Sequence, residues 1–197
     1  VIRGRLALDK VIQHYEEGGF DIVAGRSGQA SLAALPSQRL ALLRDQILEV
    51  APSYDVVIID LGAGVERNVR MLAASAIRTL LVALDEPTSL TDAYAFIKLG
   101  NAAGQSKNVG IVINQALNKT EGQKTYKTLL KACENFLRLK PPLIGMVQHD
   151  AKVKDSIRRQ TPILTRHPDS DAAQDVVQIA ERVIREIASL KKIRASA

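Results

Sequence analysis

The stretch Tyr54-Asp55-Val56-Val57-Ile58-Ile59-Asp60-Leu61-Gly62-Ala63-Gly64 decides the fold that we expect for this chain. Its four consecutive β-branched residues, 56–59, lie between Pro52 and Gly62. A continuous apolar run of this kind is typical of a strand that is buried on both faces, as in a parallel sheet covered by helices. The stretch therefore predicts an α/β protein.

Short apolar strands and amphipathic helices alternate on both sides of this stretch. Further strands are expected at residues 22–24, 79–84, 109–113 and 143–147. Helices are expected at residues 38–50, 65–76, 89–99, 120–137, 152–159 and 172–190, with Thr88 or Ser89 capping the third. Strand–helix repeats of this length predict right-handed βαβ units. We therefore expect a doubly wound, mostly parallel sheet with helices on both faces, a three-layer sandwich.

Length and composition are those of one globular domain. The chain has 197 residues, of which 46% are hydrophobic and 4% aromatic, so Leu, Ile, Val and Ala must build the core. We expect one domain over residues 1–197, with 191–197 as a flexible tail. The single cysteine, Cys133, excludes an internal disulfide framework and fits a reducing cytoplasm, where it would be a small buried apolar residue.

The charge balance allows several anionic partners without selecting one. The formal net charge is +6, which permits attraction to nucleotide phosphates, nucleic acid or anionic lipid and is equally compatible with a solvated basic surface. Lys191, Lys192 and Arg194 follow the last expected helix, but no Phe or Trp accompanies them, which favours a solvated helix end over a membrane anchor. DNA is not excluded, although no dense basic helix with interleaved aromatic residues is present.

Asp60 is the strongest candidate for chemistry. In a parallel sheet, ligands bind at the carboxyl ends of the strands, and Asp60 would stand at such an end. A carboxylate held there, followed by Gly62 and Gly64, forms a Walker B pattern that can bind a water of Mg²⁺ between two phosphates. The alternative is that Asp60 is only a turn or helix-cap residue. The partner motif, Gly-x-x-x-x-Gly-Lys-Ser/Thr, does not occur in the chain.

Four segments in order resemble the MinD/ParA family of deviant-Walker P-loop ATPases. They are residues 54–64, Asp85-Glu86-Pro87-Thr88-Ser89-Leu90-Thr91-Asp92-Ala93-Tyr94, Val112-Ile113-Asn114 and Gly145-Met146-Val147-Gln148-His149-Asp150. The second is most similar to the FlhG-like branch, which regulates flagellar number and placement. The last is similar to a family segment whose usual form is Gly-x-Ile-Pro-x-Asp, with Gln148 in place of the proline. The family's first strand, P-loop and acidic switch strand are expected upstream of Val1.

The resemblance implies roles for specific residues. Asp60 would bind Mg²⁺ through water, Gly62 and Gly64 would face the γ-phosphate and the dimer partner, and Asn114 would hydrogen-bond adenine. The backbone around Val147, His149 and Asp150 would complete the base pocket. For Asn114, a strand-end turn residue is the alternative.

The resemblance also implies a function for the intact protein: ATP-dependent homodimerisation that acts as a switch in cellular positioning. The process would be flagellar placement or number, division-site selection or partitioning, with a protein partner. The location would be cytoplasmic, or peripheral at the inner face of the membrane. Two alternatives remain open: an ATP-dependent carboxylate-activating synthase of the cobyrinic acid amidating or dethiobiotin-forming type, and a nucleotide-free binding module. Residues 1–197 alone are expected to hydrolyse no ATP.

Overall fold

The computed structural model describes residues 1, 6–25, 35–104 and 108–195. They fall into two compact units, Val1–Ser75 and Ala76–Ala197, each with its own internal contacts. The second unit holds the parallel sheet, and the first holds the segment around Asp60.

A three-stranded parallel sheet forms the centre of the second unit. Its strands are β3 (Thr79–Ala83), β4 (Val109–Ala116) and β5 (Leu143–Gln148), in the order β3-β4-β5. The central strand β4 is buried at every position from Val109 to Ile113, as its β-branched run predicts for a strand covered on both faces. In register, Val82 pairs with Val112 and Val112 pairs with Gly145. The carboxyl ends of all three strands therefore lie at one edge of the sheet.

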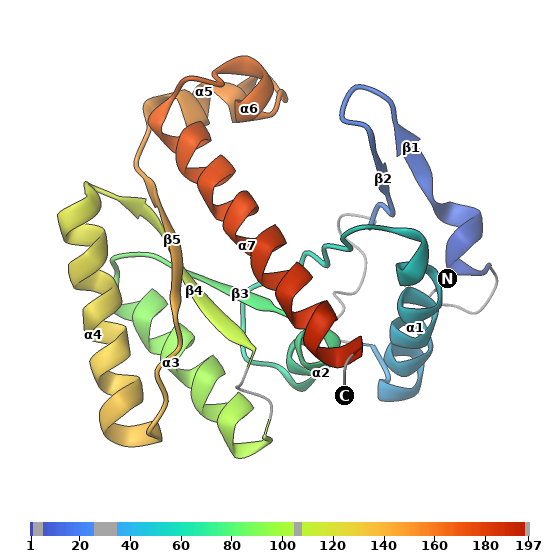
Figure 1. Ribbon diagram of the computed structural model, residues 1–197, viewed down its shortest axis with the longest axis horizontal. Coiled ribbons are helices and arrows are strands. Elements are labelled where there is room, and N and C mark those ends of the chain that lie inside the picture. Colours follow the sequence, from blue (N-terminus) through green and yellow to red (C-terminus); the bar gives the residue numbers. More distant parts are fainter. Residues whose placement is uncertain (2–5, 26–34, 105–107, 196–197) are drawn as a thin grey trace. The chain divides into compact units, whose positions relative to one another are not determined.

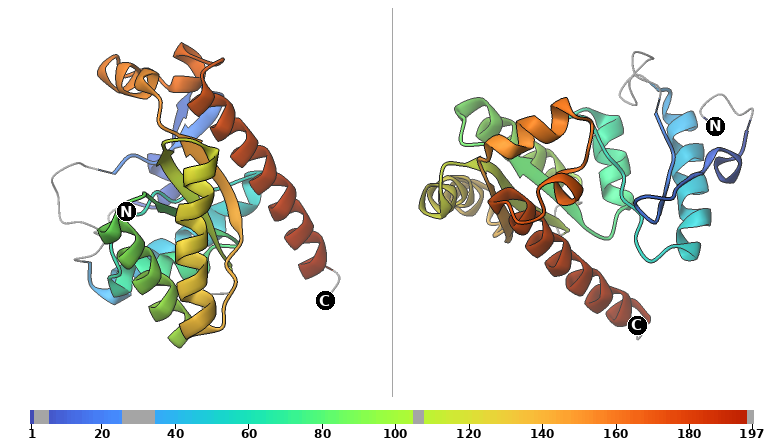
Figure 2. Two further views of the ribbon diagram at one scale, coloured as in Figure 1. Left: turned by 90° about the vertical axis from the view of Figure 1, so that its left-hand side faces the viewer. Right: turned by 90° about the horizontal axis from the view of Figure 1, so that it is seen from above.

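Helices cover both faces of this sheet. Helices α3 (Pro87–Ala102) and α4 (Lys119–Leu137) lie on one face, and α7 (Asp171–Ala195) crosses the other (Figure 1, Figure 2). Two neighbouring residues of β5 show this division, since Gly145 packs against Ile179 of α7 and Met146 packs against Gly122 of α4. The predicted parallel α/β fold is thus confirmed. Cys133 on α4 is fully buried, as predicted, and burial raises the pKa of its thiol to about 11.

Short helices and caps complete the second unit. Helices α5 (Ala151–Arg158) and α6 (Ile163–Arg166) connect β5 to α7. The prediction that Thr88 or Ser89 caps α3 is wrong, because Glu86 occupies the N-cap and Pro87 the first turn. The Ser89 hydroxyl instead accepts a hydrogen bond from the Leu84 N–H, at 2.9 Å. Helix α7 continues to Ala195, beyond its predicted end at residue 190, and residues 196 and 197 of the predicted tail lie outside the described residues.

The first unit combines a hairpin with two α-helices. Strands β1 (Gln13–Tyr15) and β2 (Phe20–Ile22) pair antiparallel, and the principal helices are α1 (Ser37–Val50) and α2 (Arg67–Ser75). Single 3-10 turns, η1 (Leu8–Val11) and η3 (Ala51–Ser53), precede β1 and follow α1. The predicted strand at residues 22–24 thus lies two residues earlier, in an unpredicted hairpin.

The hairpin is tied to the segment that leads to Asp60. The Tyr54 hydroxyl donates to one carboxylate oxygen of Asp21 at 2.7 Å, and Nδ1 of His14 lies 2.7 Å from the other. Both bonds hold the pKa of Asp21 below its ordinary value, the bond from His14 having the larger effect. Tyr54 is therefore anchored directly before residues 56–60.

Residues 56–60 form no strand, contrary to the prediction. Val56 and Val57 are exposed, and Ile58 is 88% exposed. A strand requires the N–H and C=O groups of a neighbouring strand, and none of the described residues pairs with this segment. The apolar run has the composition of a buried strand, but within the described residues it lacks the partner that would make it one.

Candidate functional site

Asn114 lies at the end of β4, where the strand leaves regular pairing. The register between β4 and β5 shifts between Ile113 and Ala116, and Gln115 adopts a left-handed conformation with φ of 55°. The side-chain oxygen of Asn114 accepts the Gln115 N–H at 2.9 Å. Non-glycine residues adopt this conformation at an energetic cost, and such residues are concentrated at functional sites. The Asn114 NH₂ group makes no hydrogen bond to any described residue.

The end of β5 is fixed beside the end of β4. The His149 N–H donates to the Ala116 carbonyl at 2.8 Å, which extends the pairing of the two strands past the bulge. Asn114, Val147 and His149 are thereby brought to the same edge of the sheet, and the His149 side chain is exposed there. The residues that the resemblance assigns to a base pocket are thus neighbours at this edge, and their role in binding a base stays a prediction.

Both oxygens of the Asp150 carboxylate contact main-chain nitrogen atoms. One oxygen accepts the Lys152 N–H at 2.8 Å as the N-cap of α5, and the other lies 3.5 Å from the Ala172 nitrogen. The Lys152 N–H is the main reason that the pKa of Asp150 lies below its ordinary value. Contacts of Asp150 with a bound base would therefore come from its main chain.

Two further residues support this edge: Gln115, through its left-handed conformation, and Asp175, which the sequence did not single out. The Asp175 side chain on α7 is 7% exposed, and it accepts the Gln148 N–H at 3.0 Å. The sequence signals that an acceptor is needed at this point, although it does not identify Asp175. Gln148 replaces a proline of the similar family segment and so introduces a main-chain N–H that requires an acceptor.

The Mg²⁺-binding candidate, Asp60, belongs to the first unit. Its carboxylate is exposed and makes no hydrogen bond or ion pair to any described residue, which leaves its oxygens available for the water ligands that Mg²⁺ prefers. Gly64 has φ of 127°, a conformation that side chains rarely adopt, and a Cβ atom there would overlap the Glu66 carboxylate. Gly62 is exposed, with open space where a Cβ atom would be.

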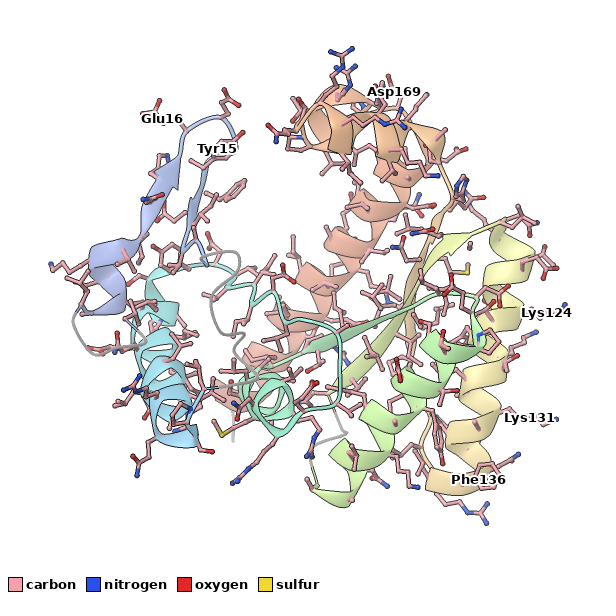
Figure 3. All side chains as sticks on the ribbon, turned by 180° about the vertical axis from the view of Figure 1, so that it is seen from behind. Tyr15, Glu16, Lys124, Lys131, Phe136 and Asp169 are labelled. Carbon is pink, nitrogen blue, oxygen red and sulfur yellow. The ribbon has the colours of Figure 1, made fainter. Side chains whose placement is uncertain are left out.

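A further surface feature of the second unit is basic. Lys124, Lys127 and Lys131 project from the outer face of α4 and flank a shallow hollow of about 690 Å³ whose floor includes Met146 (Figure 3 labels Lys124 and Lys131). Lysines at this spacing share one face of a helix. The hollow contains none of the predicted site residues.

Neither a cluster of metal ligands nor a membrane-spanning helix is found among the described residues. In residues 1, 6–25, 35–104 and 108–195, no three His, Cys, Asp or Glu side chains are grouped as a metal site would need. No helix in this described part of the chain combines the length and the apolar character needed to cross a bilayer.

The fold and the residues at its edge define a class of protein: a parallel α/β protein whose candidates Asn114, Val147, His149 and Asp150 lie at the carboxyl ends of β4 and β5, where such sheets bind ligands. No family model matches the chain. It is 31% identical over 183 residues to the antiactivator FleN of Pseudomonas aeruginosa, covering 93% of this chain and 65% of FleN. It is 24% identical over 190 residues to the flagellum site-determining protein YlxH of Helicobacter pylori, covering 94% of this chain and 63% of YlxH.

Solved structures agree at the level of the fold. The cell division protein MinD of Aquifex aeolicus superposes with a TM-score of 0.72 at 20% identity, covering 93% of this chain and 72% of that chain. MinD of Pyrococcus horikoshii, solved with Mg-ADP, superposes with a TM-score of 0.67 at 19% identity, covering 92% and 70%. These similarities confirm the resemblance to the MinD/ParA family and its FlhG-like branch. It spans just under two thirds of the length of FleN and YlxH.

Proposed function

We propose that the chain is the C-terminal part of an ATPase that switches between monomer and ATP-bound dimer to position a cellular structure. The observation that carries this proposal is the 31% identity to FleN, which extends over 93% of the chain. FleN is an antiactivator and YlxH determines the flagellar site. Flagellar placement or number is therefore the process we favour over division-site selection or partitioning.

ATP and Mg²⁺ are the ligands that the residues fit. The free carboxylate of Asp60 would hold a water of Mg²⁺, and the main chain at Gly62 and Gly64 would face the terminal phosphate and the dimer partner. The Asn114 NH₂ group would donate to adenine, with the main chain of Val147, His149 and Asp150 completing the base pocket. The Mg-ADP bound to Pyrococcus horikoshii MinD, which has the same fold, supports this choice.

The phosphate-binding loop would come from sequence before Val1. A loop of this kind supplies most phosphate contacts through main-chain N–H groups and a lysine, so its absence from residues 1–197 predicts that this part alone hydrolyses no ATP. Segment 56–60 supports the same view, because it pairs with no strand in the described part of the chain and an upstream strand would give it a neighbour. In the intact protein, we place the site in the cytoplasm, with a protein partner.

The substitution Asp60→Ala in the full-length native protein tests the proposal. We expect Mg²⁺-dependent phosphate release to be lost while thermal melting is unchanged, since an exposed carboxylate without partners contributes little packing. The matched control is Asp169→Ala, which removes another exposed acid, between α6 and α7 (Figure 3). If the Asp60 variant hydrolyses ATP at the wild-type rate, Asp60 is only a turn residue. If the wild type neither binds nor hydrolyses ATP, a nucleotide-free binding module becomes the better interpretation.

A further inference from the structure

The Gln148 N–H points away from the rest of the sheet. Successive N–H groups of a strand point to opposite sides of that strand. The next N–H, that of His149, donates to the carbonyl of Ala116 in β4, so the Gln148 N–H points the other way. Among the described residues, β5 pairs only with β4, so the Gln148 N–H faces the free edge. Asp175 meets it there, with one carboxylate oxygen 3.0 Å from the main-chain nitrogen and 3.5 Å from the Gln148 side-chain nitrogen.

Helix α7 follows the free edge of β5 through one stripe of residues. Asp175, Ile179 and Arg182 are spaced by four and three positions and therefore share a helix face. Ile179 packs on Gly145, and Arg182 donates from Nη1 to the Ile144 carbonyl at 3.1 Å. Asp175 is the end of this stripe that reaches the carboxyl edge of the sheet, where the base pocket is proposed.

A second tie holds the chain just beyond Gln148. Asp150 accepts the Lys152 N–H, and its other oxygen lies 3.5 Å from the Ala172 nitrogen in the first turn of α7. The main chain on either side of His149 is thus held to α7 by two carboxylates. Asp175 of α7 accepts from Gln148, and Asp150, which precedes α5, lies next to the Ala172 nitrogen of α7. Asp175 is nearly buried, so removing it would leave the Gln148 N–H without an acceptor.

We propose that Asp175 is a positioning residue for the nucleotide base: its hydrogen bond to the Gln148 N–H fixes the main chain of residues 147–150 in the conformation that receives adenine. This inference rests on the proposed nucleotide-binding function. Family segments similar to this one carry proline at position 148, which restricts the chain covalently and has no N–H. In this protein, a glutamine and a buried acceptor on α7 perform the same task.

Amide hydrogen exchange tests the hydrogen bond from the Gln148 N–H to Asp175 directly and needs no nucleotide. In residues 1–197, Asp175→Ala is expected to accelerate exchange of the Gln148 N–H at least tenfold, because that group loses its acceptor. Asp171→Ala is the matched control, since it makes the same substitution at an exposed position one turn earlier in α7. Asp175→Asn, which retains an acceptor oxygen, should preserve slow exchange. Equal exchange in the wild type and the Asp175→Ala variant would overturn the proposal.

Selectivity for the base tests the positioning role in the full-length native protein. Titration with ADP and GDP should give a preference for ADP that falls about tenfold in Asp175→Ala, the effect expected when a buried N–H loses its acceptor. The double variant Gln148→Pro/Asp175→Ala should recover the preference, because proline needs no acceptor. Proline suits this position, where the replaced N–H faces a free strand edge. A merely structural role for Asp175 predicts lower stability in both variants and no recovery of the preference.

The outcomes distinguish this inference from the proposed function. If the wild type binds neither nucleotide while Asp175→Ala still accelerates exchange of the Gln148 N–H, the nucleotide-binding function is wrong and the base-positioning role is wrong with it. The hydrogen bond between Asp175 and Gln148 would still be confirmed. If the wild type prefers ADP and Asp175→Ala keeps that preference, only the positioning role is overturned. Should Asp175→Ala fail to fold, the double variant and Asp175→Asn carry the comparison, and loss of the ADP preference in the folded double variant would overturn the proposal.

Discussion

Gly145 on β5 lies so close to Ile179 on α7 that a Cβ atom at position 145 would overlap the Ile179 side chain. Glycine at this position sets the distance between the helix and the sheet. Because Asp175 lies one turn before Ile179 on the same face of α7, the same close approach brings its carboxylate within 3.0 Å of the Gln148 nitrogen. The packing of one glycine and the geometry of the proposed base pocket are therefore connected.

Gly145→Ala is expected to destabilise the protein by about 1–3 kcal/mol, the usual effect of overpacking a filled interior. The control is Gly100→Ala in α3, where a Cβ atom meets nothing within 4 Å apart from its own helix. Alanine is a better helix former than glycine, so this control should stabilise by about 0.5–1 kcal/mol. Urea denaturation of both variants measures the difference. Equal stability of Gly145→Ala and the wild type would show that α7 moves away from β5 without loss.

Asn114→Asp is expected to reduce adenine selectivity while preserving the fold. The new carboxylate still accepts the Gln115 N–H but has lost the NH₂ donor proposed to contact adenine. One hydrogen bond corresponds to at most about tenfold in affinity. Titration of the full-length native protein with ADP and GDP measures the ratio, and thermal melting checks the fold. An unchanged preference for ADP would identify Asn114 as a turn residue that shapes the bulge.

Asp155 is expected to make the stability of the folded protein depend on pH under acidic conditions. Arg166 and then His167 hold the pKa of the Asp155 carboxyl at about 2, below its ordinary value of 3.8, through contacts of 2.5 Å and 2.9 Å. Since the folded-state pKa is the lower one, the stabilisation is complete above about pH 4 and is lost as the pH falls toward 2. Melting curves of the wild type and Asp155→Asn should therefore differ at pH 7 and converge near pH 2. Arg166→Gln should weaken the same dependence, and a constant difference across this range would contradict the assignment.

Much of the second unit could be predicted because its patterns are local. The β-branched run of β4 and the helical spacing in α4 placed both elements to within a few residues. The position of the candidate site was also predictable, because the carboxyl ends of parallel strands lie at the same edge of a sheet. Asp175 was not, because a buried carboxylate on a helix has no local pattern, and its role appears only when the direction of the Gln148 N–H is known.

The first unit was less predictable for a different reason. Strand β1 contains Gln13, His14 and Tyr15, a polar sequence without apolar alternation, and its hairpin is supported by a turn in which Gly19 has φ of 64°. Residues 56–59 show the opposite failure. Their composition matches that of β4, yet they form no strand, since strand formation depends on a partner that the segment itself does not encode.

Residues 56–61 are expected to exchange their amide hydrogens rapidly in the chain of residues 1–197 and slowly in the full-length native protein. Among the described residues, no strand pairs with residues 56–61, and Ile58 is 88% exposed. N–H groups without a strand partner exchange readily with water. An upstream strand beside it would protect those groups and cover its apolar side chains, which otherwise form an aggregation-prone edge. Hydrogen exchange of both forms, read by mass spectrometry, measures the difference, and peptides from β4 serve as the control because that strand is paired on both sides in the sheet. Slow exchange at residues 56–61 in the shorter chain would mean that this segment finds a partner within residues 1–197 or in a second copy, and a concentration series separates these two cases. Rapid exchange in both forms would remove the support that this segment gives to an upstream strand.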